Sequence, residues 1–197
     1  MDIDRILEKQ RRFFESGRTL SVSFRIRMLQ RLYNAVKRYE AQIGQALTCD
    51  LGKSDFEGFM CETGLVLSEI SYMIKHTPRF ARGQAVPTPL SQFAAMSFRK
   101  PSPYGSVLIL SPWNYPFLLT LDPLVDAIAA GNTAIVKPSA YSPATSSVIA
   151  ELISECFPAS YVAVVTGGRR ENTELLRKKF DLVFFTGSQA VGIEVLR

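Results

Sequence analysis

A short loop at residues 111–116 holds the side chain best suited to catalysis, an asparagine. The loop is Ser111-Pro-Trp-Asn-Tyr-Pro116, so two prolines restrict the backbone around Asn114 and the only tryptophan of the chain. A rigidly held amide can donate a hydrogen bond to negative charge that develops on a carbonyl oxygen. An asparagine here can instead serve as the N-cap of the following helix. The rigid loop and the neighbouring Trp113 favour the catalytic interpretation.

Two other segments are suited to binding phosphate or ribose. Gly187 and Gly192 frame a G-S-x-x-V-G segment, in which a glycine lets the backbone approach a pyrophosphate and the first amides of a helix bind it. Lys137 ends an apolar run and is followed by Pro138, so its ammonium can reach phosphate or ribose oxygens. Each segment has an ordinary alternative: Gly187 as a strand-end turn, and Lys137 as a lysine that extends from a strand end into solvent.

These segments follow short apolar runs that are typical of buried parallel strands. The runs cover residues 105–110, 132–137, 161–165 and 181–186, and helix-length segments lie between them at 117–130, 144–156 and 171–179. Runs of this length fit strands buried on both faces. The alternation predicts an α/β fold with a doubly wound, Rossmann-like parallel sheet. Ligands bind such sheets at the carboxyl ends of the strands, so the four following loops are expected to meet at one edge.

The first hundred residues are charge-rich and helical in period. Leu29, Leu32, Val36, Ile43 and Leu47 are spaced to share one helix face. Basic residues between 25 and 38 fill much of the other face, which we interpret as a solvated helix surface and not as a nucleic-acid site. We therefore divide the chain into a helical part of the cofactor domain (1–84), a connector or oligomerisation arm (85–100) and an incomplete Rossmann-like part (101–197).

Composition excludes several classes of protein. The 197 residues are 47% hydrophobic and 21% charged, unlike a disordered or collagen-like chain. The net charge of +5 favours anionic partners, either nucleic acids or phosphate-bearing cofactors. The three cysteines do not indicate a disulfide framework, and no secretory signal or membrane-length apolar run is present, so a cytoplasmic protein is expected. No residues have metal-ligand spacing. Cys156 is expected in the core and His76, the only histidine, at the surface.

Five motifs follow one another in the second half of the chain: Pro112-Trp-Asn-Tyr-Pro116, Pro123–Asn132, Val136-Lys-Pro-Ser139, Phe185-Thr-Gly-Ser188 and Val191-Gly192. Together they resemble the NAD(P)-dependent aldehyde dehydrogenase superfamily. In the first half, Phe24-Arg-Ile26, Asp50-Leu-Gly-Lys53 and Glu69–Ile74 are similar to its class 3-like branch. The resemblance covers nearly the whole chain but only the N-terminal part of the family.

The resemblance implies a role for each motif. Asn114 would be the side-chain half of an oxyanion hole. The residues that would bind NAD or NADP are Leu110, Pro112, Trp113, Lys137, Ser139, Gly168, Gly187, Ser188, Val191 and Gly192. Of these, Lys137 would bind the adenosine ribose, and Gly187 and Ser188 the pyrophosphate. The family's partners would be a small aldehyde substrate and, through the 85–100 arm, a second copy in a homodimer.

Two departures limit what the resemblance implies. The family's catalytic cysteine and glutamate lie beyond residue 197, so this chain alone is expected to be inactive and, as a sheet cut short, to self-associate. The position after Lys-Pro-Ser, where the family often has a glutamate that disfavours a 2′-phosphate, is Ala140. NADP is therefore expected to be tolerated. The alternative function is a catalytically incompetent fragment or nucleotide-binding module that binds a dinucleotide only.

Overall fold

A computed structural model describes residues 2–196. Its helices are α1 (Ile3–Glu15), α2 (Val22–Arg38), α3 (Glu40–Leu51), α4 (Asp55–Gly58), α5 (Gly64–Phe80), α6 (Leu118–Ala130), α7 (Pro143–Cys156), α8 (Arg169–Leu176) and α9 (Gln189–Val195), with 3₁₀ turns η1 (Arg18–Leu20) and η3 (Leu90–Gln92) and a π-helical turn η2 (Phe59–Thr63). Its strands are β1 (Gln84–Val86), β2 (Ser97–Arg99), β3 (Ser106–Leu110), β4 (Thr133–Lys137), β5 (Val162–Val164) and β6 (Leu182–Phe185). The predicted alternation of strands and helices after residue 105 is confirmed.

The main sheet is parallel and has the order β5-β4-β3-β6. The register places Leu110 at the end of β3 opposite Lys137 of β4 on one side and Phe185 of β6 on the other. Because the chain leaves β3 toward β4 on one side and later returns to β6 on the other, the strand order reverses next to β3. Parallel sheets bind ligands at such reversals.

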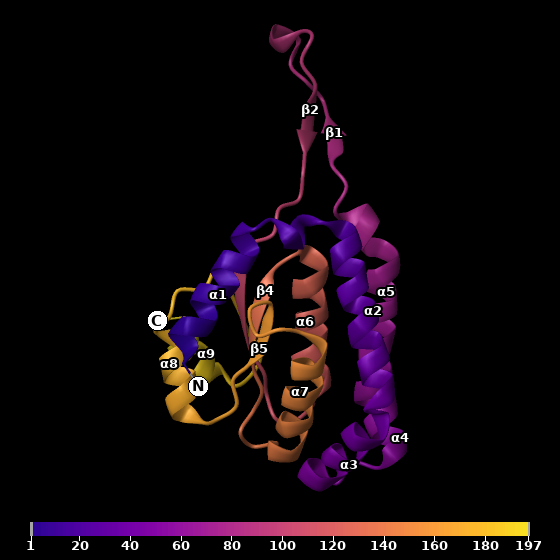
Figure 1. Cartoon of the computed structure of the whole chain (residues 1–197), viewed down its shortest axis with the longest axis vertical. Helices are drawn as coiled ribbons and strands as arrows, with labels where there is room; N and C mark the ends of the chain where they lie inside the picture. The colour runs from indigo at the N-terminus through magenta and orange to yellow at the C-terminus, as the bar shows by residue number, and fades with distance from the viewer. Residues whose placement is uncertain (1, 197) are drawn as a thin grey trace.

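Helices cover both faces of this sheet (Figure 1). On one face α6 and α7 pack against alternate strand residues such as Val107, Ile109 and Val136, and α2 and α5 lie outside them. On the other face Ile3 and Leu7 of α1 pack against Leu108 and Ile135. One apolar core therefore joins the N-terminal helices to the sheet. The α/β class predicted from the sequence is confirmed.

The N-terminal helices differ from the expected single amphipathic run. The chain breaks at Tyr39 into α2 and α3, so Ile43 and Leu47 reach the core from a second helix. The predicted stop at Gly52 is confirmed, since this residue has φ +67° after α3. The next helix begins at Ser54, whose hydroxyl accepts from Glu57 N.

The solvated basic face predicted for residues 25–38 is wrong at Arg25. This side chain is 7% exposed and donates to the carbonyl oxygens of Thr19, Leu20 and Ala129 at 2.7–3.2 Å. Three carbonyl acceptors compensate the guanidinium for the loss of water. A Cβ at Gly131, where φ is +93°, would lie 2.7 Å from this guanidinium. The close approach of Arg25 and the left-handed backbone both require glycine at the end of α6.

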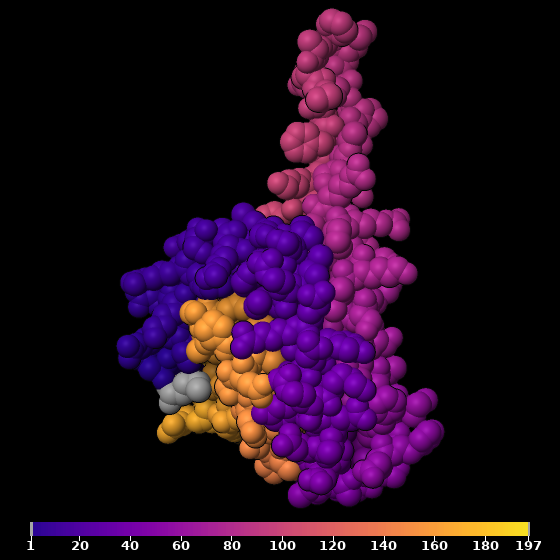
Figure 2. Space-filling model, turned by 45° about the vertical axis from the view of Figure 1, so that its right-hand side comes forward, coloured from indigo at the N-terminus to yellow at the C-terminus, as the bar shows by residue number. Residues whose placement is uncertain are grey.

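Residues 84–99 form an antiparallel hairpin, β1–β2, that projects from the body (Figures 1 and 2). Its apolar side chains are almost free of contacts, with Leu90 87%, Phe93 88% and Met96 91% exposed. The hairpin leads into the start of β3, so it projects from the amino edge of the sheet, opposite to the loops predicted to bind ligand.

Strand β6 differs from the prediction that all four strands are buried on both faces. Leu182, Val183 and Phe184 are 39–43% exposed, whereas every residue of β3 and β4 is buried. Strand β6 lies at one edge of the sheet, pairs with β3 alone, and its Leu182 and Phe184 face an open pocket beside Pro123 and Asp126 of α6. Within residues 2–196, no helix is long and apolar enough to cross a membrane.

Candidate functional site

The loops that follow β3, β4, β5 and β6 lie along one edge of the sheet, as the parallel order requires. Backbone bonds tie their first residues together: Ser111 N donates to Lys137 O at 3.2 Å, and Thr186 N to Leu110 O at 3.1 Å. The predicted site residues on these loops thus lie along the same edge, although the first and last of them, Leu110 and Gly192, are 82 positions apart in the sequence.

Lys137 is buried at the centre of this edge. It is 4% exposed, and its Nζ donates to Pro138 O at 3.0 Å. Burial lowers the pKa of its ammonium, and the carboxylate of Glu171 opposes that shift. Its neighbour Ser139 is also buried, and the Ser139 hydroxyl accepts from Tyr141 N. The alternative of a lysine that extends into solvent is therefore wrong, because the ammonium stays inside the protein.

Asn114 lies in an exposed loop between β3 and α6. The N-cap of α6 is Phe117, and it makes no side-chain capping bond, so the alternative role of Asn114 as that cap is wrong. Among residues 2–196 the Asn114 amide has no hydrogen-bond partner, whereas its backbone oxygen accepts from Lys53 Nζ at 3.1 Å. Trp113 beside it is 54% exposed. The backbone of the loop is held while the amide remains available.

The loops after β5 and β6 each lead into a short helix. Gly168 N donates to Glu171 Oε2 at 2.7 Å, a bond that lowers the pKa of Glu171. A Cβ at Gly168 would meet no atom within 4 Å, so this turn is open. The Ser188 hydroxyl is the N-cap of α9 and accepts from Val191 N at 3.4 Å, which leaves its proton free to be donated.

Gly187 has a packing role in addition to any ligand role. A Cβ there would lie 2.5 Å from the ring of Phe185, so the ring itself requires glycine at this position. Val191 on the following turn is 41% exposed, and Gly192 is half-buried. The ordinary explanation of Gly187 as a strand-end turn thus accounts for its identity, and its exposure leaves its backbone amide accessible.

Sequence reasoning missed a buried ion pair behind the Asn114 loop. Lys53 Nζ lies 2.5 Å from Glu62 Oε1, and the other carboxylate oxygen accepts from Phe117 N at 2.8 Å and Leu118 N at 3.1 Å. Glu62 is fully buried and Lys53 is 7% exposed. The only signal in the sequence was the Asp50-Leu-Gly-Lys53 motif, which we interpreted as a helix stop.

Asp50 of the same motif caps another helix. Its carboxylate accepts from Ala144 N at 3.1 Å and from Thr145 N and Thr145 Oγ1 at 2.7 Å. Negative charge at a helix N-terminus is stabilising. Asp50 therefore fixes the start of α7, just after the Lys137–Ser139 loop, while Lys53 fixes the loop after β3.

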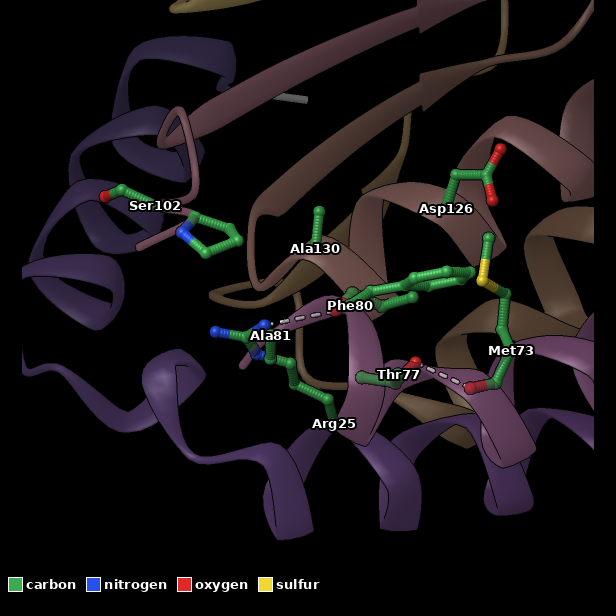
Figure 3. Close-up of a pocket in the computed structure, with 10 residues that line it drawn as sticks. Arg25, Met73, Thr77, Phe80, Ala81, Ser102, Asp126 and Ala130 are labelled. Atoms are coloured by element: carbon green, nitrogen blue, oxygen red, sulfur yellow. Dashed lines mark hydrogen bonds between the residues drawn. The ribbon is translucent and has the colours of Figure 1, made fainter. Parts of the chain in front are cut away.

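A cavity of about 380 Å³ lies away from these loops. It is lined by Arg25 near the start of α2 and by Met73 and Phe80 of α5, next to the C-terminal end of α6 and beside Ser102 (Figure 3). In a parallel sheet each crossover helix ends near the start of the next strand. The C-terminal end of α6, and with it this cavity, therefore lies at the opposite edge of the sheet from Lys137. It contains none of the predicted site residues.

The remaining reactive groups do not form a nucleophilic site. All three cysteines are unpaired; Cys156 is buried as predicted, and burial raises the pKa of its thiol to about 11. His76, expected at the surface, is partly exposed there, and its ring stacks on Tyr72 with the two ring centroids 4.0 Å apart. Within residues 2–196 there is no group of three metal-ligating side chains.

The carboxyl edge offers hydrogen-bond donors and an aromatic surface that suit a dinucleotide. The Lys137 ammonium uses one of its three N–H groups, and the buried Ser111 hydroxyl has no partner among residues 2–196. The turn at Gly168 is open, and Trp113 presents an aromatic surface. Cationic and hydroxyl donors beside an apolar surface are the groups that bind a phosphate-linked sugar and a flat base.

The family model "Aldehyde dehydrogenase family" matches residues 1–197. The chain is similar to 4,4'-diaponeurosporen-aldehyde dehydrogenase of Staphylococcus aureus, with 46% identity over 91% of the chain and 39% of that protein. It is also similar to the dog protein "Aldehyde dehydrogenase, dimeric NADP-preferring", with 39% identity over 96% of the chain and 42% of that protein.

Solved structures agree with these relatives. The substrate-bound structure of Staphylococcus aureus AldH matches 100% of this chain and 43% of its own, with 43% identity and a TM-score of 0.97. The structure of PnpE in complex with nicotinamide adenine dinucleotide matches 99% of this chain at 25% identity, with a TM-score of 0.84. The chain spans about two-fifths of the length of these relatives. A family model along the whole sequence and this agreement in fold show that the chain belongs to the aldehyde dehydrogenase family.

Proposed function

We propose that these residues are the N-terminal part of an aldehyde dehydrogenase that oxidises an aldehyde to a carboxylic acid with NAD or NADP. The observation that carries the proposal is the carboxyl edge of the sheet, where a buried lysine, the open turn at Gly168 and a free amide adjoin. The family supplies the rest of the reaction, a cysteine nucleophile and a glutamate, from residues outside this chain.

Within this function the chain's own residues bind the cofactor and the substrate carbonyl. Lys137 and Ser139 hold the adenosine ribose, and Gly187, Ser188 and Gly192 hold the pyrophosphate. Leu110, Pro112 and Trp113 line the cleft, with Gly168 and Val191 beside the adenosine. When bound, the dinucleotide supplies the nicotinamide ring that accepts a hydride. The Asn114 amide donates to the carbonyl oxygen as negative charge develops on it.

The cofactor preference is tested at Ala140. This residue is exposed directly after buried Ser139, and no carboxylate stands there to repel a 2′-phosphate. The named relative that is NADP-preferring supports the same preference here. We expect tighter binding of NADP than of NAD, and a reversal in Ala140→Glu, because the new carboxylate would accept from the ribose hydroxyls and repel the phosphate. Tighter NAD binding by the unsubstituted chain would contradict this preference.

The division of the chain follows from the same proposal. Residues 1–84 belong to the cofactor domain, which their common core with α6 and α7 supports. Residues 85–100 are an oligomerisation arm for a homodimer, supported by the exposed apolar side chains of the hairpin and by the relative that is named dimeric. Residues 101–197 are the NAD(P)-binding part. The location is the cytoplasm, and nucleic acid is not a partner.

The alternative function is dinucleotide binding without catalysis, and one comparison separates it from the first. NAD(P)H formation from an aldehyde is measured for residues 1–197 and for the same chain extended along its gene. Both functions predict NADP binding by residues 1–197 in isothermal titration. Aldehyde-dependent activity that appears only in the extended chain supports the enzyme. If the extended chain binds NADP but oxidises no aldehyde, the binding module is correct.

A further inference from the structure

The backbone of the Asn114 loop is held by two residues far away in the sequence, Lys53 and Glu62, which we call the clamp. Lys53 follows α3, and Glu62 lies in η2 before α5, yet both contact the segment between β3 and α6. Lys53 Nζ donates to Asn114 O at 3.1 Å and lies 4.0 Å from the centroid of the Tyr115 ring. A cation over an aromatic face is attracted by its quadrupole.

Glu62 holds the other end of the same segment. Its Oε2 accepts from Phe117 N and Leu118 N, which are the first amides of α6 and lack a partner in the previous turn. Its Oε1 pairs with Lys53, so each carboxylate oxygen is satisfied although the side chain is fully buried. The two residues thus hold the loop backbone from Asn114 O to the start of α6, on the carboxyl side of the Asn114 side chain, which itself remains free.

The turn that presents Glu62 is irregular. Residues Phe59–Thr63 are π-helical between α4 and α5, where an extra residue per turn changes the direction of the side chains. An uninterrupted α-helix would carry Glu62 to a different angle. Such π-helical turns are rare and are frequently found at functional sites. The irregular turn is therefore consistent with a requirement for this carboxylate at the start of α6.

A buried ion pair alone is weak evidence for a stabilising role. Removing two charges from water costs several kcal/mol, and apolar residues of similar volume often serve stability equally well. What an apolar pair cannot do is donate to Asn114 O and accept from two amides of α6. We propose that Lys53 and Glu62 are positioning residues that fix the Asn114 loop for carbonyl binding. This inference rests on the proposed function for the role of Asn114 in carbonyl binding. The contacts of Lys53 and Glu62 with the loop do not depend on that function.

Trp113 provides a direct measurement, because it is the only tryptophan and adjoins Asn114. The variants are Lys53→Met, Glu62→Gln and the double variant Lys53→Met/Glu62→Leu. We expect both single variants to melt at lower temperature, because one buried charge loses its partner. The double variant should regain most of the melting temperature. All three should show higher acrylamide quenching of Trp113; since the residue is already 54% exposed, the increase is at most about twofold.

The matched control is Asp50→Asn, which also weakens a carboxylate cap of a helix near the same edge but does not contact the loop. It should lower the melting temperature and leave Trp113 quenching unchanged. Lys53→Arg, which keeps the cation, should restore quenching toward the original value. Selective ¹⁵N labelling of the four asparagines adds a second measurement: the Asn114 signals should shift or broaden in the double variant, and those of Asn132 should not.

The double variant decides the matter. If it recovers both its melting temperature and the original quenching and Asn114 signals, the pair serves stability alone and the inference is overturned. NADP titration of the unsubstituted chain is measured in parallel. An absence of NADP binding would count against the proposed function while the loop measurements still test the clamp, so the two failures are distinguishable.

Discussion

Lys137 should oppose folding while it supports cofactor binding, and the substitution Lys137→Met separates the two effects. The ammonium is 4% exposed and makes a single hydrogen bond, to Pro138 O. Burial of a charge costs several kcal/mol, and replacement of a buried ion pair by apolar residues of similar volume often stabilises a protein by about 1–4 kcal/mol. With the partial compensation by Pro138 O and Glu171, we expect a gain of about 1–2 kcal/mol, or roughly 2–8 °C in Tm for a chain of this size.

Cofactor binding should change in the opposite direction. At a concentration of 100 times Kd, a ligand stabilises the folded state by about 2.7 kcal/mol, which is roughly 5–10 °C for this chain. The unsubstituted chain should show this shift with NADP in differential scanning calorimetry. Lys137→Met should start from a higher Tm and lose most of the shift, because the ribose and phosphate oxygens lose their ammonium donor. Lys100→Met, an exposed lysine at the other edge, should alter neither value.

The pH dependence provides a further test of the same reasoning. Burial holds the pKa of Lys137 below 10.5 in the folded state. Between the folded pKa and 10.5 the unfolded chain binds more protons, so the stability of the unsubstituted protein rises with pH. The advantage of Lys137→Met should therefore shrink as the pH approaches 10.5. A variant less stable than the original at neutral pH, or one with an undiminished NADP shift, would refute the reasoning.

Three other predictions concern stability and association. Arg25→Met should lower stability by about 3 kcal/mol in calorimetry, because three carbonyl oxygens lose a charged donor; exposed Arg27→Met is the control. Val183→Lys on the exposed edge strand β6 should reduce self-association in sedimentation velocity, since a charge on an edge opposes strand pairing; unchanged association would place the contact elsewhere. Partial desolvation and the negative charge of Glu69 raise the pKa of Asp126 to about 6, so stability should fall as the pH rises from about 4 to 6. Asp126→Asn should reduce this loss of unfolding free energy between pH 4 and 6, measured in urea titrations, by less than about 1 kcal/mol, because the side chain is exposed and its charge is screened.

The strands of the sheet could be predicted from the sequence because their signal is local. Runs such as 105–110 are bounded by Pro103 and Pro112, and apolar runs of that length have few alternatives to a buried strand. A parallel sheet then fixes where its loops meet, so the common edge for Lys137, Asn114 and Gly187 followed from topology. The exposure of β6 could not be predicted, because the sequence of a strand does not specify which elements pack against it.

Residue types and their order in the chain thus determined the α/β class, the carboxyl edge and the resemblance to a family of dehydrogenases. Only the tertiary structure decided which polar residues are buried. Arg25 has the same side chain as exposed Arg27, and Lys53 looks like part of a helix stop. Their burial depends on carbonyl oxygens and a carboxylate supplied by residues up to 104 positions away. The free energy of a buried charge is set by partners that folding brings to it, so no local pattern encodes it.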